Sequence, residues 1–210
     1  MRDYAKEFEN RVAFIRDLLK SSGAKGVIYG NSGGKDSALV GILCKAACDN
    51  TVGIMMPCAS KRNFGEDMSD GLAVAEAYFA NVAKVAEKKP TILGHFDLIK
   101  KINGDGKFFD ENDPRYTAAA NAALMTAARN RCVLEVNTSA VYRGFRKDFF
   151  PSDAILKEWL VLSGNVVITA DAHDTKALTF GFEAVAAKLK ELGYTKVQVL
   201  GKDGFTPCAL

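Results

Sequence analysis

The sequence predicts an α/β fold with a mostly parallel, six-stranded sheet and helices on both of its faces, in the doubly wound order of Rossmann-like folds. Short apolar runs alternate along the chain with longer segments of helical periodicity, and polar or glycine-containing turns separate the two. Strands that alternate with helices pair in parallel through right-handed crossovers. A closed barrel needs eight strands, so the alternative to an open sheet is a partial or distorted βα barrel.

The first four elements form a helix–strand–helix–strand series. Residues 4–20 place apolar side chains at helical spacing, with charged residues between them. Residues 26–30 are predicted to form a short buried strand, and 36–47 the next helix. A second strand at 51–56 ends before Pro57, because proline lacks the N–H that a strand would donate.

The same alternation continues to the last residues. A helix is predicted over 66–88, with Gly71 as a weak point inside it. A later helix begins at Ser152, whose hydroxyl suits the N-cap position. The remaining predicted elements, strands and helices in turn, are 91–94, 117–130, 132–136, 152–162, 166–169, 182–192 and 196–200.

The composition is that of a globular protein with a real core. Of the 210 residues, 48% are hydrophobic and 25% charged, which allows one large domain or two small ones. A net charge of +3 gives no reason to expect a nucleic-acid or membrane partner. The charged first residues do not resemble a signal peptide, and the five cysteines form no CxxC pair. A cytoplasmic protein is expected.

The strongest local motif lies between the strand at 26–30 and the helix at 36–47. Two glycines let the backbone approach a phosphate group, and the helix offers free N–H groups at its positive end. The carboxylate of Asp36 suits either a magnesium ion or a helix cap. The alternative is a tight turn whose glycines serve geometry alone. The predicted phosphate-binding residues are Ser32, Gly33, Gly34, Lys35, Asp36 and Ser37.

Three stretches around this motif resemble ammonia-dependent NAD synthetase, one of the pyrophosphate-loop ATPases. They are YAKEFENRVAFIRDLL, GVIYGNSGGKDSALVG and TVGIMMPC, and the resemblance covers residues 1–72. It implies that the loop binds the pyrophosphate of Mg-ATP and that Met56 lies beside the adenine. Lys35 departs from the aliphatic residue that is more common at its place in that family.

Both histidines of the chain follow predicted strands. His95 comes directly after one strand, and Asp171 and His173 follow another. Glu135 and Asn137, at the end of a third strand, are weaker candidates. Open sheets and barrels build their sites at these strand ends, and an Asp-x-His pair suits zinc or manganese. The alternative is that the histidines are hydrogen-bonded structural residues.

Four later stretches resemble the C-terminal half of histidinol phosphatase of the polymerase-and-histidinol-phosphatase group, a distorted barrel that hydrolyses a phosphate monoester. The resemblance implies that His95, Asp171 and His173 bind metal. It also implies that Arg143 and Arg146 hold the substrate phosphate. The His-x-His pair with which that family opens has no match in this chain. The stretches are EAYFANVAKVAEKKPTILGHFDLIKKIN, LEVNTSAVYRGFRKDFFPS, VVITADAH and GFEAVAAKLKELGY.

The two resemblances together predict a hybrid α/β protein, an engineered or natural chimera, that keeps an ATP- and phosphate-binding loop and has little or no native catalysis. Residues 1–73 would form the NAD synthetase-like segment and 74–210 the histidinol phosphatase-like segment, packed as one continuous domain. The alternatives are an ATP-dependent amide ligase of the NAD synthetase type and a metal-dependent histidinol-phosphate phosphatase. The expected ligand is a small phosphate compound, and an open sheet edge would permit a homodimer.

Overall fold

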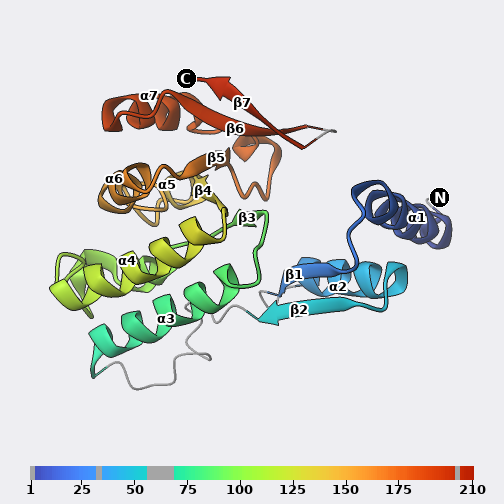
Figure 1. Ribbon diagram of the computed structural model, residues 1–210, viewed down its shortest axis with the longest axis horizontal. Coiled ribbons are helices and arrows are strands. Elements are labelled where there is room, and N and C mark those ends of the chain that lie inside the picture. The colour runs from blue at the N-terminus through green and yellow to red at the C-terminus, as the bar shows by residue number, and fades with distance from the viewer. Residues whose placement is uncertain (1–2, 32–34, 56–68, 202–203) are drawn as a thin grey trace. The chain divides into compact units, whose positions relative to one another are not determined.

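The computed structural model describes residues 3–31, 35–55, 69–201 and 204–210. The chain divides into two compact units, Met1–Cys58 (unit 1) and Ala59–Leu210 (unit 2). Helices and mostly parallel strands confirm the α/β class (Figure 1). The prediction of a single six-stranded sheet is wrong. The described strands form three small sheets instead, with the strand orders β1-β2, β3-β4-β5 and β6-β7.

Unit 1 consists of two helices and a parallel pair of strands. The side chain of Asp3 caps the first helix by accepting from the Lys6 N–H (3.1 Å), and Gly23 ends that helix in the left-handed conformation. The two strands pair in register from Val27 opposite Thr51. The elements in order are α1 (Tyr4–Ser22), β1 (Val27–Asn31), α2 (Lys35–Ala47) and β2 (Thr51–Met55).

The packing of unit 1 is thin. Arg16 of α1 donates to the carbonyl of Ala46 (2.8 Å) and so holds α1 against the end of α2. Large apolar side chains on both helices and both strands are half exposed, among them Leu39 (54%) and Ile28 (51%). Parallel strands are normally covered on both faces. Unit 1 alone therefore buries little of its apolar surface.

Unit 2 holds the larger set of elements. Its helices are α3 (Gly71–Ala86), α4 (Pro114–Arg129), α5 (Ser139–Tyr142), α6 (Asp153–Val161) and α7 (Phe182–Leu192), with short 3-10 turns η1 (Leu98–Ile102), η2 (Gly104–Gly106) and η3 (Thr175–Ala177). Its strands are β3 (Ile92–Leu93), β4 (Val133–Asn137), β5 (Asn165–Thr169), β6 (Lys196–Gly201) and β7 (Gly204–Ala209). Strands β3, β4 and β5 are parallel, whereas β6 and β7 form an antiparallel hairpin.

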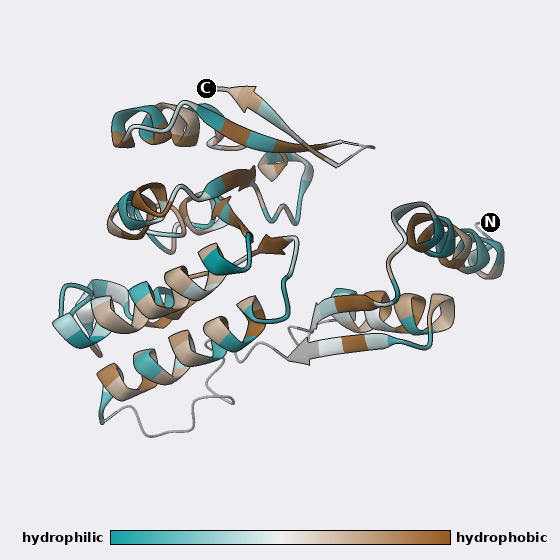
Figure 2. Ribbon diagram, in the orientation of Figure 1, coloured by the Kyte–Doolittle hydropathy of each residue, from teal (hydrophilic) through white to brown (hydrophobic). Residues whose placement is uncertain are grey.

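The core of unit 2 lies around the strands β3 to β5, whose residues are mostly hydrophobic (Figure 2). Phe79 of α3 is fully buried and packs edge-on against Tyr116 of α4, with ring centroids 5.2 Å apart. Trp159 of α6 is also fully buried, and its indole N–H donates to the carbonyl of Asn165 (2.9 Å). This core fixes the strand ends from which the candidate site residues project.

No described helix combines the length and the apolar character that crossing a membrane would require.

Candidate functional sites

The first candidate site lies where β1 passes into α2. Lys35, Asp36 and Ser37 are the first three residues of α2, and Asp36 is exposed in its first turn. Backbone N–H groups in the first turn of a helix have no partner inside the helix and favour anions. The predicted phosphate ligands Ser32, Gly33 and Gly34, and the predicted adenine neighbour Met56, lie outside the described residues.

The crossover from β1 to β2 sets the start of α2 after the carboxyl end of β1. The strands are parallel over their full length, with Asn31 opposite Met55 at the last pair. Helix α2 joins them, and three residues separate its first residue from the end of β1. Ligands of open α/β sheets bind beyond the carboxyl ends of the strands. The roles of Lys35, Asp36 and Ser37 as ligands stay predictions.

The second candidate site lies at the carboxyl ends of β3, β4 and β5. His95 follows β3, Glu135 lies on β4, and Asp171 and His173 follow β5. His95 and Asp171 both have left-handed backbone conformations, with φ values of 55° and 45°. Residues other than glycine adopt this conformation at a cost, and such strain gathers at functional sites. Two of the three predicted metal ligands are therefore held in strained positions.

The carboxylate of Glu135 is the centre of this second site. Its Oε2 accepts from the His95 backbone N–H (2.8 Å) and lies 3.1 Å from His95 Nδ1. Its Oε1 accepts from Thr169 Oγ1 (2.6 Å) and Asn137 Nδ2 (3.2 Å). Gly94 makes room for the carboxylate, because a Cβ there would lie 3.0 Å from Oε2. Burial opposes ionisation, but the hydrogen bonds from His95 and Thr169 outweigh it and lower the pKa of Glu135 to about 2.

The ring of His95 is held in one orientation by Glu135. A carboxylate only accepts, so the proton on Nδ1 faces Glu135 and Nε2 points away from it. The hydrogen bond to Glu135 raises the pKa of His95, against the opposing effect of burial. A 2.6 Å hydrogen bond from the Tyr78 hydroxyl to the His95 carbonyl fixes the backbone as well. The alternative prediction, a hydrogen-bonded structural histidine, fits this geometry.

His173 lies in a more open part of the same edge. Its Nδ1 is 2.8 Å from the Asp171 carbonyl and 3.9 Å from Asp171 Oδ1, and it also contacts Arg143 Nη2. The His173 side chain is 58% exposed and the Asp171 side chain 36%. The structure thus brings Arg143 beside His173, and the role of Arg143 as a phosphate ligand stays a prediction.

A zinc or manganese site at His95, Asp171 and His173 finds no support in the structure. Within the described ranges, no three side chains of the His, Cys, Asp or Glu type lie close enough together to hold a metal ion.

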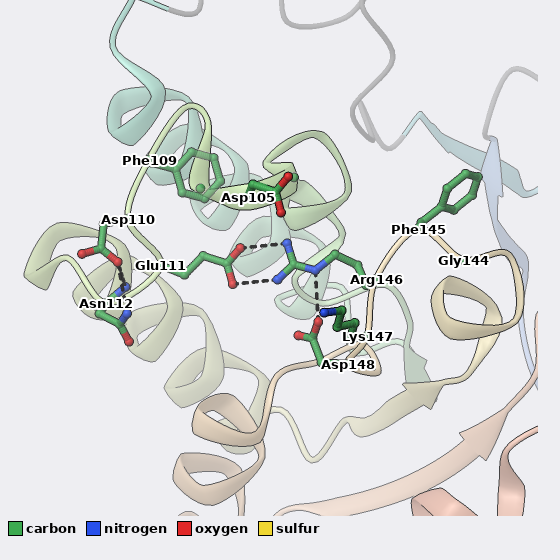
Figure 3. Close-up of a pocket in the computed structure, with 12 residues that line it drawn as sticks. Asp105, Phe109, Asp110, Glu111, Asn112, Gly144, Phe145, Arg146, Lys147 and Asp148 are labelled. Carbon is green, nitrogen blue, oxygen red and sulfur yellow. Dashed lines mark hydrogen bonds and ion pairs between the residues drawn. The ribbon is translucent and has the colours of Figure 1, made fainter.

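Arg146 lies in the wall of a cavity of about 710 Å³ (Figure 3). Its guanidinium forms a two-pronged ion pair with Glu111 (3.1 and 3.2 Å), and its Nε donates to Asp148 (3.1 Å). Most of its N–H groups are therefore engaged within the protein. The cavity is lined by Gly104, Asp105, Gly106, Phe109, Asp110, Glu111, Asn112, Gly144, Phe145, Arg146, Lys147 and Asp148.

Next to Arg146 lies a buried cluster of ion pairs, formed with Asp97, Lys100 and Asp148, that the sequence did not predict. Lys100 is fully buried, and its ammonium lies 2.8 Å from Asp148 Oδ2 and 3.2 Å from Asp97 Oδ2. Burial disfavours the charge on Lys100, but the two carboxylates prevail and raise its pKa. Asp148 also binds Arg146, so the cluster joins η1 to the loop before α6. The only sequence signal was the short spacing of Asp97 and Lys100.

Comparison with known proteins places the chain in a family. The family model described as NAD synthase matches residues 7–141, more than half of the 210 residues. The chain belongs to the NAD synthase family. The match extends well beyond residue 73, after which the sequence predicted a change of family, and the comparisons give no support for a histidinol phosphatase-like part or a chimera.

Several similar relatives carry the name NH(3)-dependent NAD(+) synthetase. The protein from Finegoldia magna is 34% identical over 98 residues, which are 45% of this chain and 39% of the relative. That from Alkaliphilus metalliredigens is 40% identical over 76 residues, 36% and 30% of the two chains. That from Mycobacteroides abscessus is 47% identical over 49 residues, 23% and 18%. The chain thus matches less than half the length of each of these NAD synthase relatives.

Proposed function

We infer that unit 1 binds Mg-ATP through the loop between β1 and α2, and that the chain serves an ammonia-dependent amidation of the NAD synthetase type. The observation that carries this proposal is the parallel β1-α2-β2 crossover. It sets the first turn of α2, with Asp36 and Ser37, directly after the Ser-Gly-Gly sequence. Membership of the NAD synthase family supports the same ligand.

The chemistry of the helix start accounts for the choice of ligand. The N–H groups of the first turn and the serine hydroxyl suit phosphate oxygens. The Asp36 carboxylate would repel a bare phosphate, so we assign it to the magnesium ion that accompanies ATP. The amidation itself requires a carboxylate to attack the α-phosphate of ATP, which releases pyrophosphate and forms an acyl-adenylate. Ammonia then attacks the acyl carbon of that intermediate and displaces AMP.

Calorimetry with Mg-ATP tests the binding. We expect Asp36→Asn to weaken Mg-ATP binding by about tenfold or more, because one charged ligand of the ion is lost. Asp49→Asn is the matched control: Asp49 is exposed beyond the other end of α2, and its one ion-pair partner among the described residues is Lys45 (3.6 Å). Equal affinities of the two variants would contradict the assignment of Asp36. Absence of Mg-ATP binding by the unchanged protein would refute the proposed function.

A second function is favoured by one observation in unit 2. Arg143 contacts His173 at the strand edge where His95 and Asp171 hold strained backbones. This supports a phosphate-monoester site on the segment 74–210, and the predicted boundary after residue 73 belongs to this proposal. Phosphate release from histidinol phosphate, with and without added zinc or manganese, tests it. Turnover that Arg143→Lys leaves unchanged would exclude the site, because lysine cannot replace the two-pronged contact.

A further inference from the structure

Unit 2 gathers basic side chains at the amino-terminal edge of its parallel sheet, opposite the edge that carries the second candidate site. They lie at the ends of α3 and α4 and in the loops that follow, residues 87–91 before β3 and residues 130–132 before β4 (Figure 1). The Thr91 carbonyl accepts from the Val133 N–H (3.2 Å), which holds the two loops side by side. The exposed basic residues here, together called the basic edge, are Lys84, Lys88, Lys89, Arg129 and Arg131.

The basic edge is not neutralised by acidic neighbours. Glu87 is the one acidic residue in the two stretches 84–91 and 129–132. None of the five basic residues forms an ion pair with a carboxylate of the described residues. By contrast, Lys100, Arg115 and Arg146 of the same unit each pair with two carboxylates. The basic edge therefore creates a positive potential that an anionic partner can use.

Two of the five basic residues have a backbone conformation that glycine adopts more easily. Lys89 and Arg131 are left-handed, with φ values of 56° and 57°. The residue that ends α7 in the same way is Gly193 (φ 100°), the usual choice at such a helix end. Positive charge also stabilises a helix C-terminus, but Lys84 and Arg129 already supply it in the last turns of α3 and α4. The fold alone therefore does not account for basic side chains at 89 and 131.

The chemistry of the basic edge fits the phosphate backbone of a nucleic acid. Protein–protein interfaces are rich in aromatic residues and poor in lysine. Three of the five residues here are lysines, and the stretches 84–91 and 129–132 contain no aromatic residue. Interfaces with nucleic acids are much more positively charged. Because no aromatic side chain is present for a base to stack on, the contacts are to phosphates and carry no sequence preference.

We propose that the basic edge of unit 2 binds the phosphate backbone of a nucleic acid without preference for its sequence. This function goes beyond the Mg-ATP site proposed for unit 1. The net charge of +3 gave no sign of it, because acidic residues elsewhere in the chain mask the local excess. Neutralising phosphates releases counterions, so the affinity should fall steeply with salt. Four or five contacts correspond to a decrease of about 250-fold between 50 and 200 mM salt.

Fluorescence anisotropy with a labelled DNA duplex of arbitrary sequence tests the proposal. The double variant Lys89→Gly with Arg131→Gly removes two charges from positions that glycine tolerates better. We expect its affinity to fall by about tenfold or more at 50 mM salt, while its Tm stays the same or rises. The matched control is Ser163→Gly, since Ser163 has the same left-handed conformation (φ 58°) after α6 but no charge. It should bind the duplex as tightly as the unchanged protein.

The outcomes distinguish this proposal from its alternatives. Absence of duplex binding by the unchanged protein would overturn it, and so would equal affinities of the double variant and the unchanged protein. An equal loss of affinity in Ser163→Gly would assign the effect to the backbone instead of the charges. Displacement of the duplex by Mg-ATP would place the duplex at the loop of unit 1, against the proposal. Polyglutamate or phosphatidylserine vesicles that bind more tightly than the duplex would replace the nucleic acid with an acidic protein or a membrane.

Discussion

At the scale of single residues, Glu135 is the side chain on which the strand edge of unit 2 depends most. It accepts from His95, Asn137 and Thr169, and its own site is nearly closed to solvent. We expect Glu135→Gln to lower the free energy of unfolding of unit 2 by about 1.5–3 kcal/mol, the usual contribution of hydrogen bonds to a charged group. Urea unfolding at pH 6 measures the change. Glu158→Gln, on the exposed face of α6, should change it by less than about 0.5 kcal/mol.

The Glu135–His95 pair also predicts how stability depends on pH. The pKa of Glu135 is lowered from 4.5 to about 2, so its contribution is complete above pH 4.5 and is lost as the pH falls towards 2. The pKa of His95 is raised above 6.5, so its contribution is complete below pH 6.5 and is lost as the pH rises through the raised pKa. The stability difference between the unchanged protein and Glu135→Gln should therefore be largest between pH 4.5 and 6.5. A difference that is constant from pH 3 to 9 would contradict this pairing.

Residue-scale roles were only partly predictable from the sequence. The positions of His95, Asp171 and His173 at strand ends follow from the alternation of strands and turns, and the structure places them there. The partner of Arg146 does not follow from any pattern, because Glu111 lies 35 residues earlier and meets it only in the folded chain. An arginine can bind a phosphate group or pair with a carboxylate inside the protein. The sequence shows the arginine in both cases, so it could not tell which role Arg146 has.

At the scale of elements, the start of α3 requires a glycine at position 71, although glycine is a poor helix former. The sequence predicts it as a flaw inside a helix, but it is the first residue of α3, after the cap Asp70. A Cβ at Gly71 would lie 2.7 Å from the Phe108 carbonyl carbon. We expect Gly71→Ala to destabilise unit 2 by about 1–3 kcal/mol, although alanine favours helices. Gly104→Ala, which would meet open space, is the control, and urea unfolding of both variants measures the difference.

Element types were predictable, whereas sheet membership was not. Six predicted strands correspond to β1 to β6, each within a few residues. Strand β7 was missed because Gly204 and Pro207 are poor strand formers, but an edge strand of a hairpin tolerates proline. Periodicity shows whether a segment is half buried or fully buried; it does not show which strands pair. That choice depends on tertiary contacts, so one continuous sheet was inferred where the described strands form three small sheets.

At the scale of the whole molecule, the chain divides into two compact units, so we expect ligand binding and core stability to be separable. The single tryptophan of the chain, Trp159, is fully buried in the core of unit 2, so its fluorescence reports the unfolding of that unit. The proposed Mg-ATP site lies in unit 1. At about one hundred times its dissociation constant, Mg-ATP should stabilise the unit that binds it by about 2.7 kcal/mol.

We therefore expect Mg-ATP to raise the midpoint temperature of the unfolding transition that far-ultraviolet circular dichroism detects for the helices of unit 1. The midpoint temperature of the transition that Trp159 fluorescence detects should stay unchanged. Glu135→Gln should lower the midpoint temperature of the transition detected by Trp159 fluorescence. It should leave the stabilisation of unit 1 by Mg-ATP unchanged. Among the described residues of unit 1, the buried hydrophobic side chains are those of Val12 and Cys44, so we expect this unit to unfold at a lower temperature than unit 2. If Mg-ATP and Glu135→Gln move both transitions together, the two units unfold as one cooperative body, and the separation argued from their cores is wrong.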